Sequence, residues 1–208
     1  SFALLMKARS KNRRVFRNKP QMNLCSIQES NDIPKEAIEY FCRGDLGSSV
    51  KDDVEYLIEV FHDAKEYGSI LEVKEIDFKA LENRIEEIRS NAPEDIFELQ
   101  YREAILGKIP PLIQQAKIMS QKYDVVCTNP PYMGNRGMNP KLSKYISKHF
   151  PNTKTDLFAV FIDVCGGYTR RKGFLSLITQ PTWLFLSTFE KLREKMIEDK
   201  TICNLLHM

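Results

Sequence analysis

The 208-residue sequence is poor in the residues that build metal sites and disulfide frameworks. Its five cysteines, an odd number, are scattered and form no Cys-x-x-Cys pair, and its three histidines are isolated from one another. These spacings argue against a zinc site or a disulfide framework, so we expect no metal and a reducing, cytoplasmic environment. No apolar run approaches the roughly 18 residues of a membrane span, and no signal peptide is visible. We therefore expect neither secretion nor a membrane as a partner.

Acidic residues are scarce outside one block of the chain. Residues 29–103 hold 21 of the 28 acidic residues against nine basic ones, a net charge of −12, and the remaining residues carry +15. The segment from Lys7 to Lys19 contains no acidic residue at all. A basic remainder fits a polyanionic substrate, because phosphate contacts dominate nucleic-acid affinity. An ordinary solvated surface explains the same charge equally well, so charge alone does not decide between them.

The stretch most informative about function is Tyr123–Tyr132, with the sequence YDVVCTNPPY. Asp124 to Thr128 is a short apolar run rich in β-branched residues, which is typical of a buried parallel strand. Pro130 and Pro131 cannot donate to a ladder, so the strand must open into a loop there. Open α/β sheets bind their ligands at loops that follow the carboxyl ends of strands. We therefore expect a binding site at this loop.

The loop offers groups that suit a planar base with an exocyclic amine. Such an amine is a weak nucleophile because its lone pair is delocalised into the ring. If the side-chain oxygen of Asn129 accepts one N–H and the main-chain carbonyl of Pro130 accepts the other, the lone pair localises on the nitrogen, in a geometry that the two prolines preset. Tyr132 adds a ring that can stack on the base and lie near a sulfonium methyl donor. The pattern predicts methyl transfer to an amine.

At these residues the chain resembles the N6-adenine DNA methyltransferases that use S-adenosylmethionine and carry an Asn-Pro-Pro-Tyr motif. The wider match, which includes Gly173–Leu184 (GFLSLITQPTWL), is most similar to the large adenine methyltransferases of BREX phage-resistance systems and to related restriction–modification enzymes. The resemblance implies S-adenosylmethionine as cofactor, DNA as substrate and an adenine rotated out of the duplex. It also implies that Asn129, Pro130, Pro131 and Tyr132 are catalytic, that Asn129 contacts the cofactor as well, and that Tyr132 stacks on the base.

Three further residues are candidates for the site. The resemblance implies a polar contact to the cofactor adenine after a short strand at Met22–Ile27, and Glu29 is the candidate there, although a helix cap would look the same. Trp183 either lines the base pocket or belongs to the core. Lys141 heads a stripe of lysines at helical spacing that would contact phosphate. Between motif and stripe, the loop at residues 133–140 is predicted as a lid over the base or a passive connector.

The order of strands and helices predicts an α/β fold. We expect an incomplete doubly wound, mostly parallel sheet of the methyltransferase (Rossmann-like) type with a large helical insertion. The chain divides into a partial core with one strand (1–31), an acidic helical insertion (32–122) and the core with the catalytic motif (123–208). We assign the insertion to packing or to protein partners of a defence system.

Prolines and apolar runs give finer expectations within these segments. Pro93 and the pair Pro110-Pro111 should bound separate helices of the insertion. Further strands are expected at Phe174–Ile178 and at Ile202–Leu206. The apolar run from Thr155 to Cys165 predicts a buried helix against the sheet.

The sequence lacks the glycine-rich loop that holds the cofactor in this family. Only nine glycines occur, and no strand followed by Gly-x-Gly precedes Met22. By resemblance, that loop and the acidic residue that binds the cofactor ribose lie upstream of Ser1, in a sheet of strand order 3-2-1-4-5. We therefore expect the chain to be a fragment that does not turn over alone, whereas its full-length parent does.

Three hypotheses about function follow. The leading one is N6-adenine methylation of DNA in phage defence or restriction. The second is methylation of a protein glutamine amide or an RNA base, because the same motif occurs in such enzymes. The third is an inactive fragment whose acidic helices bind a partner. The motif thus indicates that an amine is methylated more specifically than it indicates whether DNA, RNA or a protein carries that amine.

Overall fold

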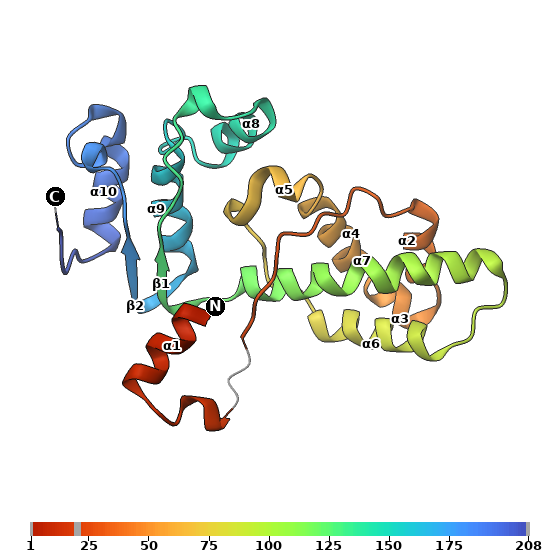
Figure 1. The fold of residues 1–208 in the computed structure, drawn as a ribbon. Coiled ribbons are helices and arrows are strands. Elements are labelled where there is room, and N and C mark those ends of the chain that lie inside the picture. The colour runs from red at the N-terminus through yellow and green to blue at the C-terminus, as the bar shows by residue number, and fades with distance from the viewer. Residues whose placement is uncertain (1, 19–21, 207–208) are drawn as a thin grey trace.

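The computed structural model describes residues 2–18 and 22–206 and has two parts joined by a long helix (Figure 1). One part is made of the helices between residues 35 and 120, and the other holds the two strands and the helices that follow them. Helix α1 (Phe2–Lys11) and the short η1 (Val15–Asn18) lie near the start of the strands, away from the helical part. The fold is therefore mixed α/β, with far more helix than strand.

The helical part contains six α-helices and one 3₁₀ turn among the described residues. They are α2 (Lys35–Phe41), α3 (Gly44–Ser49), α4 (Lys51–Val60), α5 (Ala64–Tyr67), η2 (Gly68–Ile70), α6 (Phe78–Ser90) and α7 (Ile96–Ser120). One apolar core, which includes the fully buried Phe41, Leu57, Phe61, Leu81 and Leu112, joins them. The acidic residues lie mainly on the outside, as amphipathic helices require.

Side-chain caps start two of these helices. The carboxylate of Asp77 accepts a hydrogen bond from the Ala80 N–H at the start of α6, and the carboxylate of Asp95 does the same for the Glu98 N–H in α7. Each bond satisfies one of the backbone donors left free at a helix start.

The prediction of separate helices around Pro110-Pro111 is wrong. Both prolines lie inside α7, which is continuous over 25 residues. A proline removes a helix hydrogen bond and crowds the preceding turn, which disfavours such a position. Here α7 packs into one core on both sides of the prolines, and this packing keeps the helix continuous. The buried residues of α7 in that core are Ile105, Ile109, Leu112, Ile113 and Ala116. Pro111 has no N–H to donate to the carbonyl of Gly107. Because Gly107 is exposed, water can supply that hydrogen bond instead.

Strand β1 (Tyr123–Thr128) follows α7 directly and pairs in parallel with β2 (Thr169–Leu177), which confirms the two strands predicted around the motif. Val125 pairs with Phe174 and Thr128 with Leu177. Between them the chain forms η3 (Asn135–Gly137), α8 (Pro140–His149) and α9 (Leu157–Tyr168). The predicted buried helix is α9, and it covers one face of the sheet. After β2 come η4 (Pro181–Leu184), η5 (Ser187–Phe189) and α10 (Glu190–Asp199).

A glycine is required where β2 begins its regular pairing. The register slips between the pairs Tyr123–Thr169 and Val125–Phe174, so β2 carries extra residues there. A Cβ on Gly173 would lie 2.8 Å from Cγ2 of Thr169 and 2.9 Å from the carbonyl oxygen of Asp124. Only glycine lets the two strands approach each other at this bulge.

The strands are not buried on both faces as predicted. Val125, Phe174 and Ile178 alternate on the face opposite α9, and each exposes 63–66% of its surface. Val126, Leu175 and Leu177 point the other way and are partly covered. The described residues supply a helix for one face only, which leaves the other face apolar and open.

Two segments predicted as strands have no strand structure. Met22–Ile27 and Ile202–Leu206 are irregular and pair with no strand. Gln28, next to the first segment, is instead held by a fully buried side chain of α7. The amide oxygen of Gln115 accepts from the Gln28 N–H at 2.7 Å, and its amide nitrogen donates to the Gln28 carbonyl at 3.2 Å. The side chain of Gln115 thus satisfies the backbone groups of Gln28 that a neighbouring strand would otherwise pair.

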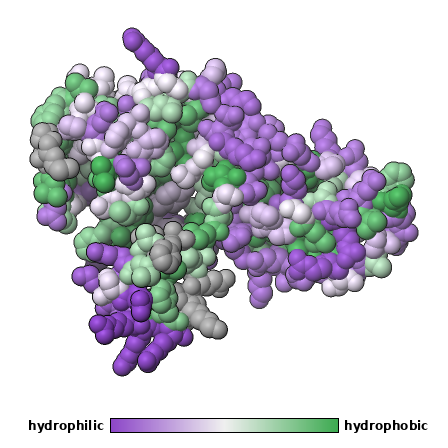
Figure 2. Space-filling model, viewed as in Figure 1, coloured by the Kyte–Doolittle hydropathy of each residue, from purple (hydrophilic) through white to green (hydrophobic). Residues whose placement is uncertain are grey.

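Hydropathy is unevenly spread over the surface. In Figure 2 the projecting α1–η1 region is mostly hydrophilic, in line with its run of basic residues. The far end of the helical part, where α7 begins, shows apolar surface, and Ile96 and Phe97 are exposed there. No helix within residues 2–18 and 22–206 is long and apolar enough to cross a membrane.

We predict that Gln115→Leu destabilises the protein by about 1–3 kcal/mol, because the N–H and C=O of Gln28 lose their partners inside the structure. Urea denaturation measures the change. Gln114→Leu is the matched control, because Gln114 is the neighbouring residue and is exposed. Equal stability of the two variants would contradict the role of Gln115.

Candidate active site

The motif loop begins at the carboxyl end of β1, where the sequence predicts it. The N–H of Ile178 donates to the carbonyl of Thr128, so the two strands stay paired up to the loop. Pro130 is buried, whereas Asn129 and Tyr132 on either side of the prolines are exposed. The stiff proline segment therefore anchors the loop and leaves its two functional side chains accessible.

Asn129 and Tyr132 lie next to each other. The hydroxyl of Tyr132 is 3.4 Å from Oδ1 of Asn129 and 3.3 Å from the carbonyl oxygen of Ile178, and donates a long hydrogen bond toward both. Its ring is 48% exposed and packs edge-on against Phe158 of α9, with ring centroids 6.3 Å apart. One side of the Tyr132 ring is thus supported by the core, and an amide oxygen lies beside it.

One carboxylate fixes the loop after the motif. Oδ1 of Asp156 accepts hydrogen bonds from the N–H of Met133 and from the N–H of Phe158, both at 3.2 Å. The N–H of Leu157 donates to the carbonyl of Met133 at 2.9 Å, and Gly134 forms an antiparallel bridge with Asp156. Asp156 therefore caps α9 and ties the motif loop to that helix.

At the start of α9, Asp156 is also a favourable negative charge near the N-terminus of the helix. Its second role, as an acceptor for the N–H after Tyr132, depends on a contact across 23 residues. The available signal was local: an aspartate directly before an apolar helical run is a typical N-cap. It does not reveal which loop lies within reach of that cap.

The loop at residues 133–140 is anchored rather than open along its length. The N–H of Asn135 donates to the carbonyl of Thr155, and Met138 is buried against the core of α8 and α9. Asn139 caps α8 by accepting from the Leu142 N–H at 2.8 Å. These contacts favour the connector interpretation over the lid.

The other three predicted site residues have partners of their own. Trp183 is 7% exposed, packs with Phe158 and Phe189, and donates its indole N–H to the hydroxyl of Thr179. Its ring therefore has a packing role in this structure. The proline loop that carries it does follow β2, the strand beside the motif strand, as predicted.

Lys141 and Glu29 are both engaged by the helical part. Nζ of Lys141 lies 2.8 Å from Oδ2 of Asp63, and Nζ of Lys65 lies 3.2 Å from Oε1 of Glu29. A phosphate at Lys141, or the cofactor adenine at Glu29, would have to share or displace these partners. The structure thus brings Asn129 and Tyr132 together at the motif loop and leaves Trp183, Lys141 and Glu29 in separate contacts.

A cleft of about 500 Å³ lies elsewhere in the strand-containing part. Residues from α9 and α10 line it together with the segment after η2 and the end of α7, so it borders the helical part, and no residue of the motif loop is among them. The nearby thiol of Cys165 is no candidate nucleophile, because burial raises its pKa to about 11 and keeps it neutral at physiological pH. No set of three histidine, cysteine or carboxylate side chains is placed to hold a metal in the described part of the chain.

Comparison with known proteins assigns the chain to a family. Residues 2–208 match the family described as Eco57I restriction-modification methylase. The chain belongs to this family. It is 34% identical over its whole length to the adenine-specific methyltransferase BrxX of Escherichia coli O9:H4 (strain HS), and 33% identical to the adenine-specific methyltransferase PglX of Lacticaseibacillus casei (strain Zhang). The recognition made from the Asn-Pro-Pro-Tyr motif is therefore confirmed.

The chain covers all of its own length in these matches but only 18% of BrxX and 17% of PglX. It thus spans less than a fifth of the Eco57I-family relatives that it matches.

We predict that Asp156→Ala frees the motif loop, because the N–H of Met133 loses its acceptor and α9 loses its cap. Hydrogen exchange of the backbone amides at residues 133–135 should become at least about tenfold faster, since roughly 1.4 kcal/mol of protection corresponds to that factor. Asp156→Asn, which keeps an acceptor oxygen, should exchange more slowly than Asp156→Ala.

Asp163→Ala is the matched control on the same helix, because Asp163 pairs only with the exposed Lys195 of α10. It should leave exchange at residues 133–135 unchanged. If Asp163→Ala and Asp156→Ala have the same effect, the loop is not held by Asp156.

Proposed function

We propose that this chain is part of a longer enzyme that transfers a methyl group from S-adenosylmethionine to the N6 amine of adenine in DNA, in restriction or phage defence. The supporting observation is the arrangement at the end of β1, where an exposed amide and an exposed ring flank two prolines in a chain of the Eco57I methylase family. Both relatives named above are adenine-specific methyltransferases, which favours adenine as the base.

The motif loop would activate the amine. Oδ1 of Asn129 accepts only a long bond from Tyr132, and the carbonyl of Pro130 accepts none from the described residues, so both oxygens have capacity for the two N–H groups of adenine. Holding both N–H groups draws the nitrogen toward tetrahedral geometry and localises its lone pair. Because the prolines and Asp156 fix the loop, these acceptors need no rearrangement during the reaction.

S-adenosylmethionine would supply the electrophilic methyl group. Asn129 and Glu29 are the residues of this chain assigned to it, and Tyr132 offers an electron-rich ring beside the sulfonium. The methyl carbon would pass from sulfur to the amine nitrogen, the carbon–sulfur bond would break to leave S-adenosylhomocysteine, and the nitrogen would release one of its two protons to water. Proximity and orientation therefore carry the step, with no histidine required near the motif.

We propose that further strands of the longer enzyme extend the sheet at its edges and that helices of the longer enzyme cover its bare face. A doubly wound sheet places helices on both faces, and the open face with Val125, Phe174 and Ile178 has the apolar composition of a covered one. The glycine-rich cofactor loop would come from those strands. The division into residues 1–31, 32–122 and 123–208 belongs to the same proposal.

The basic residues outside the helical part are proposed to contact DNA, with Lys141 among them if DNA displaces Asp63. The segment from Lys7 to Arg17 is largely exposed and has no acidic neighbour in sequence. The acidic surface of the helical part would repel phosphate, so we assign that part to protein partners rather than DNA.

Asn129→Ala tests the proposal directly. Loss of one pre-organised polar group at a reacting centre typically costs about 10²–10³ in rate, so transfer to adenine-containing DNA should fall by at least that factor. DNA affinity should remain within about twofold, because the amide would contact the flipped base and the cofactor but no phosphate. The assay is incorporation of labelled methyl groups by the full-length protein.

Asn135→Ala is the matched control, since Asn135 is an exposed asparagine of the same loop. It should retain full activity. Duplexes with 2-aminopurine at the target position should gain fluorescence on binding if the base is flipped. Retained methylation by Asn129→Ala, or transfer to RNA or a protein amide but not to DNA, would refute the proposal.

Tyr132 should act through its ring rather than its hydroxyl. The hydroxyl makes only bonds of 3.3–3.4 Å, so Tyr132→Phe should keep kcat/KM within about threefold. Tyr132→Ala should lose about 5–150-fold, because stacking of a base on an aromatic ring contributes ~1–3 kcal/mol. Equal losses in both variants would assign the role to the hydroxyl instead.

A further inference from the structure

The two sides of the proposed site are joined through one short segment of the helical part, at residues 62–67. On one side of this segment lies the loop Gln28–Asn31, which carries Glu29, and on the other lies α8, which follows the motif loop. Both make polar contacts to the segment. The helical part therefore connects two regions that the sequence separates by more than 100 residues.

Asp63 is the residue that contacts both sides. Its Oδ1 accepts a hydrogen bond from Nδ2 of Asn31 at 2.9 Å, and its N–H donates to Oδ1 of Asn31 at 2.8 Å. Its other carboxylate oxygen, Oδ2, takes the ion pair with Lys141 at 2.8 Å. The Lys141 and Asn31 contacts hold the pKa of this carboxyl below its usual range, so the ion pair is intact near neutral pH.

The backbone at Asp63 is in an unfavourable conformation. Its φ of 55° lies in the left-handed region, which among the described non-glycine residues only Lys172 shares. Glycine adopts this region at no cost, and asparagine and aspartate tolerate it better than other residues. An aspartate therefore suits this turn less well than glycine, but only the aspartate supplies the carboxylate that contacts Asn31 and Lys141.

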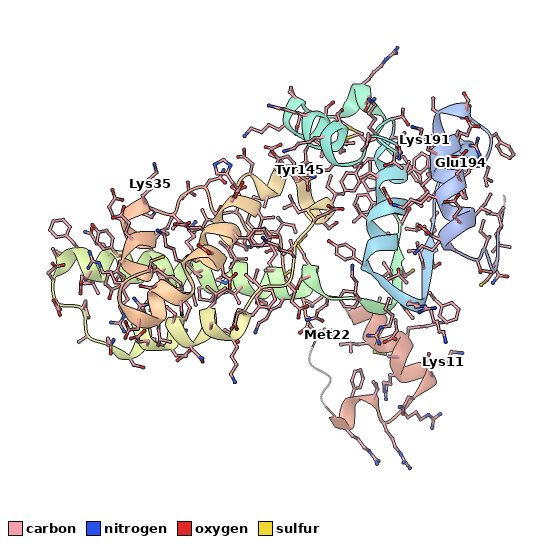
Figure 3. The ribbon with its side chains drawn as sticks, turned by 180° about the vertical axis from the view of Figure 1, so that it is seen from behind. Lys11, Met22, Lys35, Tyr145, Lys191 and Glu194 are labelled. Atoms are coloured by element: carbon pink, nitrogen blue, oxygen red, sulfur yellow. The ribbon has the colours of Figure 1, made fainter. Side chains whose placement is uncertain are left out.

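Two neighbouring contacts strengthen the same connection. Nδ2 of Asn139, the residue that caps α8, donates to Oε2 of Glu66 at 2.6 Å. The rings of Tyr67 and Tyr145 stack with centroids 4.6 Å apart, and Figure 3 shows Tyr145 where α8 meets the helical part. We call these contacts, together with those of Asp63, the latch.

We infer that Asp63 is a positioning residue for methyl transfer: it sets the separation between the loop that carries Glu29 and the helix that follows the motif. The inference rests on the proposed methyl transfer and takes Lys141 as the partner of Asp63 rather than of DNA. The loop Gln28–Asn31 is fixed by Gln115 and by the bond from Ser30 to Phe61, so α8 is the side that loosens when the latch is broken. Misplacement of the amine relative to the cofactor then lowers the rate of the chemical step more than it weakens binding.

Asp63→Gly removes the carboxylate while it keeps the backbone turn, so it distinguishes the effect of the carboxylate on kcat from an effect on stability. Glycine suits the positive φ, so the unfolding temperature should stay unchanged or rise, whereas kcat should fall about tenfold, with KM for DNA and for S-adenosylmethionine changed less than about threefold. Asp63→Asn keeps the bond to Asn31 and loses the charge, so its kcat should be intermediate. A purely structural role for Asp63 predicts full kcat in the glycine variant.

A double-mutant cycle with Lys141 tests the ion pair. Lys141→Met should lower kcat as much as Asp63→Asn, and the double variant should lose no more than either single one. Lys141→Arg, which keeps the pair, should restore kcat. If Lys141 acts on DNA instead, Lys141→Met will raise KM for DNA in a salt-dependent way, additively with Asp63→Asn, and the inference fails.

Hydrogen exchange supplies a readout that does not require methyl transfer. In the full-length protein, Asp63→Gly should accelerate exchange at residues 139–143, and Glu55→Gln, which removes an exposed acid from α4, should not. Unchanged exchange at residues 139–143 overturns the inference whatever the activity. Asn129→Ala, assayed in parallel, reports separately on the proposed function, because it leaves the latch and its exchange intact.

Discussion

One oxygen atom, Oδ1 of Asp156, determines where the motif loop lies. It accepts the first N–H after Tyr132 and the N–H of Phe158 in the first turn of α9, so the loop and the helix cannot move independently. The same helix covers the sheet and supports the Tyr132 ring through Phe158. The start of α9 thus holds the loop that carries the proposed catalytic groups, through this cap and through the bridge between Gly134 and Asp156.

The helical part reaches this unit by two routes. α7 runs directly into β1, so the long helix fixes where the motif strand starts. The second route is the latch, in which residues 63–67 contact α8. These contacts fix where the loop after the motif ends. A continuous α7 matters for the first route, because a break at Pro110-Pro111 would uncouple the core of the helical part from the strand. Burial on both sides of the prolines offsets their local cost.

The sequence predicted those features that neighbouring residues determine. The strand ending at two prolines, its parallel neighbour and the apolar helix α9 were all confirmed, because each is encoded in a run of adjacent residues. The continuity of α7 was not predicted, since tertiary packing overrides the helix-breaking tendency of Pro110 and Pro111. Met22–Ile27 was predicted as a strand from weak alternation, but a strand also needs a partner strand, and none pairs with this segment among the described residues.

The residues of the candidate site likewise divide into those whose position local sequence predicts and those whose contacts come from distant segments. Asn129 and Tyr132 are three residues apart, so a short rigid loop suffices to bring them together. Lys141 and Glu29 were assigned from their own segments, and both meet partners from residues 63–65 that no local pattern reveals. Trp183 is a lone large aromatic residue, and the core of α9 and α10 accounts for it.

The bare face of the sheet links this fold to its function. Burial of a side chain such as Val125, Phe174 or Ile178 typically stabilises a protein by about 1.5–3 kcal/mol, so an open face forgoes several kcal/mol. A two-stranded sheet is marginal without further strands or cover. Asn129 lies at the end of one of these strands, so whatever covers the face also stiffens the strand that carries the amide. Stability of the sheet and geometry of the proposed site thus depend on the same face, in a chain that spans under a fifth of the length of its relatives.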